Sequence, residues 1–194
     1  MKKSEQVLPE NYKEIFLIDL QKDKKKAIFI NALAFVIAII MIVIASFFIP
    51  ITELFSFENG MLDYSLRFIT IIVATVAYMI LHELVHGVAM KICGTKKIKY
   101  GFTGMYAFAG SDDFYYKKSY LFIALAPVVL WGIVLLVINL FVNMNWFWVV
   151  YFVQISNISG AAGDFYVSVK FASLPDDILV KDHGVGMTVY SKAE

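Results

Sequence analysis

The sequence predicts an all-α membrane protein with four transmembrane helices and a short β-hairpin in the cytoplasmic loop between spans two and three. Two compositional observations predict this class: 60% of the 194 residues are hydrophobic, and only 17% are charged. An ordinary soluble domain carries about 25% charged residues. The third observation is that the apolar residues form runs too long for buried strands. A net charge of +1 argues against a nucleic-acid partner, and the single Cys93 excludes an intrachain disulfide.

Four apolar runs define the expected spans, at about 27–50, 68–93, 119–142 and 145–174. The first and third runs contain no charged residue, whereas the second and fourth contain a few ionisable side chains. At 1.5 Å per residue, each run is long enough as a helix to cross a hydrocarbon core of roughly 30 Å. We therefore expect a multi-pass integral membrane protein.

The distribution of basic residues predicts the orientation, because Lys and Arg near span ends stay on the cytoplasmic side. Seven of the seventeen basic residues precede the first span, six lie from Lys91 to Lys118 and three lie from Lys170 onward. The remaining one, Arg67, falls in an expected outside segment. We expect both termini in the cytoplasm. The chain then divides into a cytoplasmic amphipathic segment (1–26), a four-span core (27–174) and a cytoplasmic tail (175–194).

Apolar residues recur at helical spacing among the lysines of the N-terminal segment. These are Tyr12, Ile15, Phe16 and Leu20. The pattern favours a helix lying on the anionic inner leaflet. The alternative is a basic topogenic signal with a short lead-in.

The loop between spans two and three has the alternation of a strand. Ile98, Tyr100 and Phe102 alternate with Lys97, Lys99 and Gly101, and Thr103 and Gly104 separate them from Tyr106 and Phe108. Two alternating runs joined by a Gly-containing turn predict a β-hairpin.

The second span contains His82, Glu83 and His86 in the order H-E-x-x-H. On a helix, residues i and i+4 leave the same face one turn apart, so both imidazoles can bind one Zn²⁺ with Glu83 beside them. Ionisable groups in a membrane helix cost about 2.5 to 3.5 kcal/mol each and are usually functional. The alternative is a water-filled crevice lined by these side chains without metal.

A catalytic zinc takes three protein ligands, so a third donor is needed. No third histidine follows Gly87 at metzincin spacing, and His183 lies in the tail. Asp112 and Asp113 in the inner loop stay candidates. Asp164 is favoured, because it is the only acid in the fourth run and a carboxylate inside a span needs a partner.

Depth in the bilayer brings Asp164 close to the two histidines. His82 and His86 lie some 14 to 18 residues into span two, and Asp164 lies about 19 residues into span four. At about 1.5 Å per residue, the depths of these side chains in the bilayer differ by a turn or two of helix. Small residues before Asp164 permit close helix approach. Asn157, seven residues earlier on the same face, is a candidate to hydrogen-bond a ligand, the hairpin or a substrate backbone.

At these residues the chain resembles the site-2-protease-like intramembrane metalloproteases, in which H-E-x-x-H on one span is joined by an aspartate from a later span. It also resembles a family of small bacterial membrane proteins known as "putative zincin peptidases". The resemblance implies His82 and His86 as zinc ligands, Glu83 as catalytic base and Asp164 as third ligand. One departure is Phe165, because the site-2 pattern usually has Gly after the aspartate.

The resulting hypothesis is a zinc-dependent endopeptidase that cleaves a membrane-protein or peptide substrate within or at the inner edge of the bilayer. Glu83 would take the proton of the attacking water. Tyr100 and Phe102 are candidate substrate-binding residues, since the hairpin can pair with an extended substrate by β-augmentation. A hairpin that only closes the mouth of the bundle is the alternative.

The rival hypothesis is a non-catalytic membrane protein that binds a metal or a partner, such as a regulatory or immunity protein. The intact Glu83 favours the enzyme, because zinc binding alone does not need a base. A composition rich in Lys, Ile and Phe favours a bacterial cytoplasmic membrane. The sequence predicts no oligomeric state.

Overall fold

The structure is a computed structural model that describes residues 3–19, 21–104, 107–184 and 186–193. Leu20 and Tyr106, which belong to the sequence patterns above, lie outside the described residues. The elements in chain order are β1 (Ser4–Glu5), β2 (Tyr12–Asp19), α1 (Lys24–Ser46), the 3-10 helix η1 (Ile51–Phe55), α2 (Gly60–Ile92), β3 (Lys99–Phe102), β4 (Ala107–Gly110), β5 (Phe114–Tyr116), α3 (Lys117–Phe141), α4 (Met144–Gly160), α5 (Ala162–Ala172), β6 (Leu179–Asp182) and β7 (Gly186–Lys192). The chain is therefore mostly helical, with strands from both ends and from the α2–α3 loop.

The chain divides into two compact units, each built from separate segments. The first unit consists of Met1–Ile30, His82–Pro127 and Gly163–Glu194, and the second consists of Asn31–Leu81 and Val128–Ala162. Each unit has its own apolar clusters. They are described separately below.

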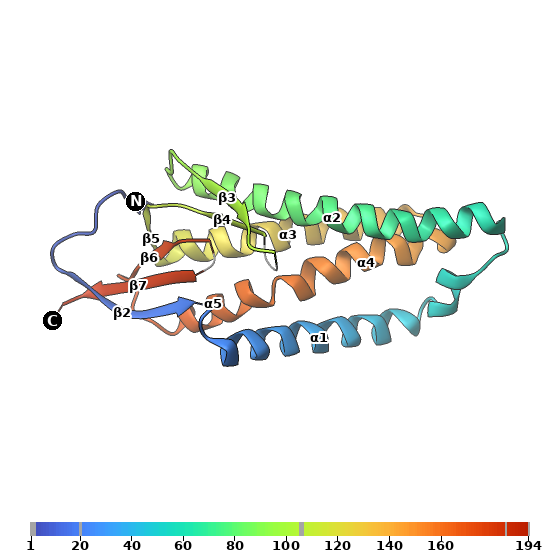
Figure 1. The fold of residues 1–194 in the computed structure, drawn as a ribbon, viewed down its shortest axis with the longest axis horizontal. Helices are drawn as coiled ribbons and strands as arrows, with labels where there is room; N and C mark the ends of the chain where they lie inside the picture. The colour runs from blue at the N-terminus through green and yellow to red at the C-terminus, as the bar shows by residue number, and fades with distance from the viewer. Residues whose placement is uncertain (1–2, 20, 105–106, 185, 194) are drawn as a thin grey trace. The chain divides into compact units, whose positions relative to one another are not determined.

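Three of the four predicted runs are single long helices, α1, α2 and α3 (Figure 1). By length and apolar composition, each could cross a membrane. The fourth run is instead divided at Ala161 into α4 of 17 residues and α5 of 11 residues. Ser156 and Ser159 donate hydrogen bonds to carbonyls four residues earlier, a pattern that weakens and bends helices. Gly160 and Gly163 lower the helix propensity further.

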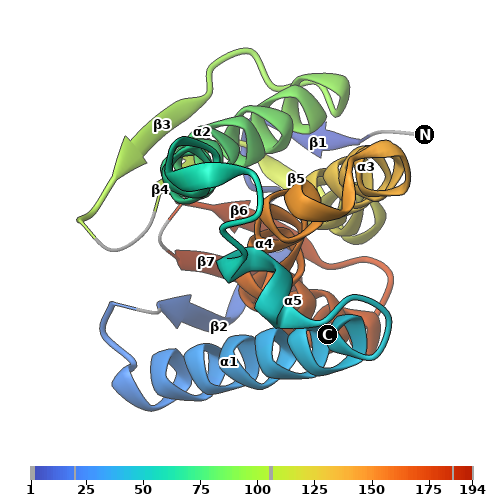
Figure 2. The same ribbon diagram turned by 90° about the vertical axis from the view of Figure 1, so that its right-hand side faces the viewer.

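The first unit contains a five-stranded antiparallel sheet that the expected all-α fold lacks. Its strand order is β1-β5-β6-β7-β2, and Figure 2 shows β5, β6, β7 and β2 in that sequence. The central strands β6 and β7 come from the segment expected to be a cytoplasmic tail, and β5 directly precedes α3. The tail is therefore part of the folded core of this unit.

The N-terminal segment forms strand β2, so the predicted amphipathic helix is wrong. Phe16 and Ile18 pack on the core, whereas Ile15 and Leu17 are each 46% exposed. This alternation has the two-residue period of a strand. Pairing with β7 from Tyr12↔Lys192 to Asp19↔Gly186 decides the conformation, and a local reading of helical spacing cannot detect a partner so distant in sequence.

The core of the first unit joins the helix ends to the sheet. Its buried members are Ile18, Ala89, Met90, Cys93, Tyr115, Tyr120, Ile123, Ala124, Val167, Phe171, Ile178, Val180 and Val189. They come from the end of α2, the start of α3, α5 and four strands, with Cys93 directly after α2 and Ile178 directly before β6. This packing holds the part of α2 that carries the H-E-x-x-H pattern against α3 and α5.

Strands β3 and β4 pair antiparallel in a separate two-stranded sheet, with register Lys99↔Gly110 to Phe102↔Ala107. The ring of Tyr100 lies against Gly87, immediately after His86, where a Cβ would overlap the ring. The absence of a side chain at Gly87 therefore lets the hairpin pack directly on α2 beside the H-E-x-x-H residues.

The second unit is held by buried polar anchors. Arg67 is 1% exposed, forms an ion pair with Asp63 at 3.1 Å and donates hydrogen bonds to the carbonyls of Glu53, Leu54 and Ser56. Trp148, also 1% exposed, donates to the carbonyl of Pro50. These contacts tie η1 to α2 and α4, and they give Arg67 a structural role.

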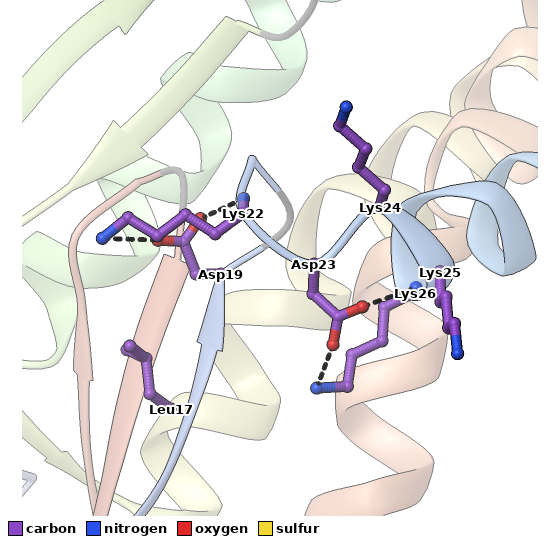
Figure 3. A pocket seen from close by; sticks show the side chains of 7 residues that line it. All are labelled: Leu17, Asp19, Lys22, Asp23, Lys24, Lys25 and Lys26. Atoms are coloured by element: carbon purple, nitrogen blue, oxygen red, sulfur yellow. Dashed lines mark hydrogen bonds and ion pairs between the residues drawn. The ribbon is translucent and has the colours of Figure 1, made fainter.

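The junction between β2 and α1 forms a shallow basic pocket (Figure 3). It is lined by Leu17, Asp19, Lys22, Asp23, Lys24, Lys25 and Lys26. Asp19 and Asp23 pair with Lys22 and Lys26, and the carboxylate of Asp23 also accepts the backbone N–H of Lys26 at the start of α1. Figure 3 shows Lys24 and Lys25 pointing in different directions, so these lysines do not converge on one point.

Candidate metal centre

Two histidines lie on one face of α2, one helical turn apart. His82 and His86 are each 9% exposed, and their ring centroids are 4.8 Å apart. Residues i and i+4 are neighbours on a helix surface, so the helix itself aligns the two imidazoles.

Asp164 brings a carboxylate to these histidines from α5. Its Oδ2 is 3.7 Å from Nε2 of His82, and its Oδ1 is 3.9 Å from Nε2 of His86. Each carboxylate oxygen therefore faces one imidazole. Asp164 lies in the first turn of α5, where the positive end of the helix dipole favours a negative charge.

The three side chains fit a zinc ion. In the part of the chain that the structure describes, their ligand atoms all lie within 4.8 Å of one another. Two ligand atoms on a tetrahedral zinc ion are about 3.4 Å apart, so the observed separations need only small side-chain movements. Two imidazoles and one carboxylate are also the ligand set of catalytic zinc sites that keep a fourth position open.

The backbone of α3 fixes the ring of His86. Its Nδ1 lies 2.9 Å from the carbonyl oxygen of Ile123. Because a carbonyl oxygen only accepts, Nδ1 of the neutral ring carries the proton, and Nε2, 3.9 Å from Oδ1 of Asp164, is left unprotonated and able to bind a metal ion. Hydrogen bonds of this kind orient histidines that bind metals.

Glu83 is half-buried beside the histidines and contacts strand β4. Its carboxylate receives a backbone hydrogen bond from Ala109. The hairpin therefore contacts the acid that the sequence predicts as catalytic base.

A further acid, Asp182, lies at the end of β6 in the same unit. Its Oδ2 accepts a hydrogen bond from the Tyr120 hydroxyl at 3.0 Å, and its Oδ1 accepts one from the backbone N–H of Gly184 at 2.7 Å. Burial raises the pKa of Asp182 to about 6, and the charge of Asp164 acts in the same direction, although both hydrogen bonds lower it.

The other candidate third ligands lie elsewhere in the first unit. Asp112 is exposed and forms an ion pair with Lys99 at 2.7 Å. Asp113 is outside the group of close ligand atoms, and Nε2 of His183 lies 3.2 Å from the Thr188 hydroxyl. Asp164 is thus the acid that the fold brings to the histidines.

The three candidate substrate-binding residues have different surroundings. Asn157 lies in the second unit, fully buried, where it accepts a hydrogen bond from Tyr78 and donates one to the carbonyl of Val128. These bonds indicate a packing role. Tyr100 and Phe102 lie on β3 and are 50% and 66% exposed, so they are accessible to a partner.

Sequence reasoning missed Tyr120, Ile123 and Asp182. Neither a backbone carbonyl nor a tyrosine in an apolar run has a recognisable pattern. For Asp182 a sequence signal existed, because Asp182-His183-Gly184 is typical of an Asx-turn. The structure contains this turn, with Gly184 at a φ of 90°. Nothing local, however, connects that turn with a helix residue such as Tyr120.

Comparison with protein families matches residues 75–179, more than half of the chain, to the family described as "Putative zincin peptidase". The matched range contains His82, Glu83, His86 and Asp164, and it ends before Asp182. Searches of curated proteins and of solved structures found no match.

Proposed function

Since the chain belongs to this zincin peptidase family, we propose that it is a zinc-dependent, membrane-embedded endopeptidase of the site-2-protease type, acting on membrane-associated protein or peptide substrates. The observation that carries the proposal is the convergence of His82, His86 and Asp164 from α2 and α5, with one carboxylate oxygen facing each imidazole. Glu83 follows His82 directly on the same helix, as the chemistry requires.

His82, His86 and Asp164 would hold the ion, which supplies a Lewis acid that activates water and polarises the scissile carbonyl. Glu83 is the base in this proposal: it accepts the proton of the attacking water and returns it to the leaving nitrogen. Ile123 keeps Nε2 of His86 directed at the site through the hydrogen bond to Nδ1.

The hairpin supplies a place for the substrate. A helical substrate hides its carbonyls in its own hydrogen bonds, so it must be extended before hydrolysis. Strand β3 is largely exposed, and the backbone of the neighbouring strand β4 contacts Glu83. We propose that β3 pairs with the extended substrate, with Tyr100 and Phe102 contacting its side chains.

The proposed setting is a bacterial cytoplasmic membrane. Three helices have the length and apolar composition to cross a bilayer, and the basic residues gather in segments that the positive-inside rule assigns to the cytoplasm. In this topology both termini, the hairpin and the metal centre lie on the cytoplasmic side.

Zinc content and cleavage together test the function. We expect one zinc per chain by elemental analysis of detergent-purified wild-type protein, loss of zinc in His82→Ala and Asp164→Asn, and retention in Asp112→Asn as the matched control. A peptide library prepared from membrane proteins, reconstituted in vesicles and read by mass spectrometry, is the cleavage probe.

The variant Glu83→Gln separates catalysis from binding. It should keep its zinc and lose cleavage by at least about a thousandfold, because the proton acceptor is gone while the ligands stay. No zinc in folded wild-type protein after zinc supplementation contradicts the proposal. Zinc without any difference between wild type and Glu83→Gln favours a non-catalytic binding protein.

A further inference from the structure

Asp182 is an acid that the proposed reaction does not use, and it lies outside the residues matched by the family. It is the last residue of β6, whose neighbours β5 and β7 pair with it on both sides. Its backbone carbonyl accepts the N–H of Ser111. The strand therefore places this side chain firmly within the first unit.

Two contacts connect Asp182 with the surroundings of the histidines. Tyr120 donates a hydrogen bond to the carboxylate of Asp182 and lies on α3. One turn later on α3, the carbonyl of Ile123 accepts a hydrogen bond from His86. On the other side, the backbone of His183 and Gly184 lies directly against Gly110, next to Ala109, whose amide contacts Glu83.

The charge of Asp182 acts on the residues of the site. Asp182 interacts electrostatically with both Glu83 and Asp164. It does not belong to the group of close ligand atoms, and both of its oxygens already accept hydrogen bonds. Direct coordination is therefore assigned to Asp164, whereas Asp182 acts on the site only through its charge.

A purely structural role does not need a charge at this position. A neutral side chain such as Asn can also accept a hydrogen bond from Tyr120 or Gly184, whereas burying a carboxylate near other carboxylates costs free energy. A divalent cation nearby makes the carboxylate favourable instead, because its negative charge then attracts the ion in a medium of low dielectric constant.

We propose that Asp182 supports the metal centre by its negative charge, strengthening cation binding by His82, His86 and Asp164 without coordinating the ion. This inference rests on the proposed function and deepens it. It makes the C-terminal strands part of the metal centre.

The experiment compares zinc affinities by competition with a chromophoric chelator, using full-length protein in detergent at pH 8. We expect Asp182→Asn to bind zinc about ten- to a hundredfold more weakly than the wild type, the range seen when outer partners of metal ligands are removed. Asp177→Asn is the matched control, because it removes the same charge from a partly exposed site in the same tail. Its affinity should stay within twofold of the wild type.

Tyr120→Phe separates charge from hydrogen bonding. It removes the hydroxyl but keeps the carboxylate, so its zinc affinity should fall less than threefold. Cobalt provides a second readout: the visible absorption bands of Co²⁺-loaded Asp182→Asn should match those of the wild type, because the ligands are unchanged. If Asp182→Asn does not fold, Asp182→Ser replaces it, since its hydroxyl can still accept from Gly184.

Three results would overturn the inference. They are an unchanged zinc affinity in Asp182→Asn, an equal loss in Tyr120→Phe, and cobalt bands that change with Asp182. In each case the proposed function is still supported if the wild-type protein binds zinc and His82→Ala does not. Wild-type protein that binds no zinc overturns both.

Discussion

Asp182 shows that the first unit retains an energetically unfavourable residue. Its carboxylate is partly removed from water and interacts with the negative charge of Asp164, and its two hydrogen bonds offset this only in part. The raised pKa of Asp182 means that the folded protein binds this proton more tightly than the unfolded chain does. The stability of the fold therefore depends on pH.

The pH dependence of stability follows from the sign of this shift. The pKa of Asp182 is about 6 in the folded protein and 3.8 in the unfolded chain. Below pH 4 the group is protonated in both states. Between about pH 4 and pH 6 the unfolded chain has released this proton while the folded protein still holds it, so the stability of metal-free wild-type protein falls across this range. Above pH 6 the loss is complete and amounts to about 3 kcal/mol relative to acidic pH.

Asp182→Asn removes this loss. The free energy of unfolding of the metal-free variant, measured with a chelator present, should gain about 3 kcal/mol relative to the wild type between pH 4 and pH 7. Asp177→Asn should follow the wild-type curve. Parallel curves for Asp182→Asn and the wild type would show that the carboxylate is not desolvated.

Among the elements, the β3–β4 hairpin depends on glycines for its position. Tyr100 lies on Gly87, and Phe108 lies against both Gly101 and Gly184, at points where a Cβ would overlap an aromatic ring. The hairpin therefore packs against α2 and the β6–β7 turn at positions without side chains. This fixes β3 next to the H-E-x-x-H residues.

Gly87→Ala tests whether the contact between Tyr100 and Gly87 is needed for cleavage. The added methyl group pushes the Tyr100 ring off α2 and shifts β3, so we expect cleavage of the membrane-peptide library to fall about tenfold with one zinc per chain retained. Gly132→Ala on α3 is the matched control, since a Cβ there meets only an ordinary contact, 3.5 Å from Nδ2 of Asn157. It should be fully active and slightly more stable, because Ala is the better helix former.

A double variant shows whether the effect passes through the tyrosine. Once Tyr100→Ala has removed the ring, adding Gly87→Ala should change cleavage no further, because neighbouring residues that share one contact are not additive. Full activity in Gly87→Ala would contradict a role for the hairpin in binding the substrate.

For the whole molecule, the first unit is assembled from three segments that are far apart in sequence. Strand β2 comes from the N-terminal segment, β5 from the middle of the chain, and β6 and β7 from the C-terminal segment. Valines 180 and 189 of β6 and β7 are fully buried in the same core as Ala89 and Met90 of α2. The C-terminal strands thus pack against the end of α2 that carries the H-E-x-x-H residues.

Deleting residues 175–194 should therefore abolish zinc binding, although the four predicted ligand and base residues stay in the chain. Elemental analysis of the detergent-purified protein measures this, and circular dichroism should show lost strand content. A chain that lacks only Ala193 and Glu194 is the control, because the pairing of Lys192 with Tyr12 is kept. One zinc per chain in the long deletion would contradict an integral tail.

The sequence by itself determined the apolar helices and the H-E-x-x-H spacing on α2. Hydropathy is a sum over neighbouring residues, and the spacing of His82, Glu83 and His86 is a property of one helix, so both are readable locally. It also indicated Asp164 and the hairpin, from a lone acid in an apolar run and from strict alternation.

Only the tertiary structure decided the five-stranded sheet, the break at Ala161 and the place of Asp182. Strand β2 resembled an amphipathic helix because its partner β7 is far away in the sequence, and pairing across such a distance leaves no trace in a local pattern. The contact between Tyr120 and Asp182 likewise joins residues 62 positions apart. Backbone pairing and side-chain contacts over such separations exist only once the chain has folded. They therefore decide the surroundings of the candidate metal centre, whereas the local pattern indicates the two histidines on α2.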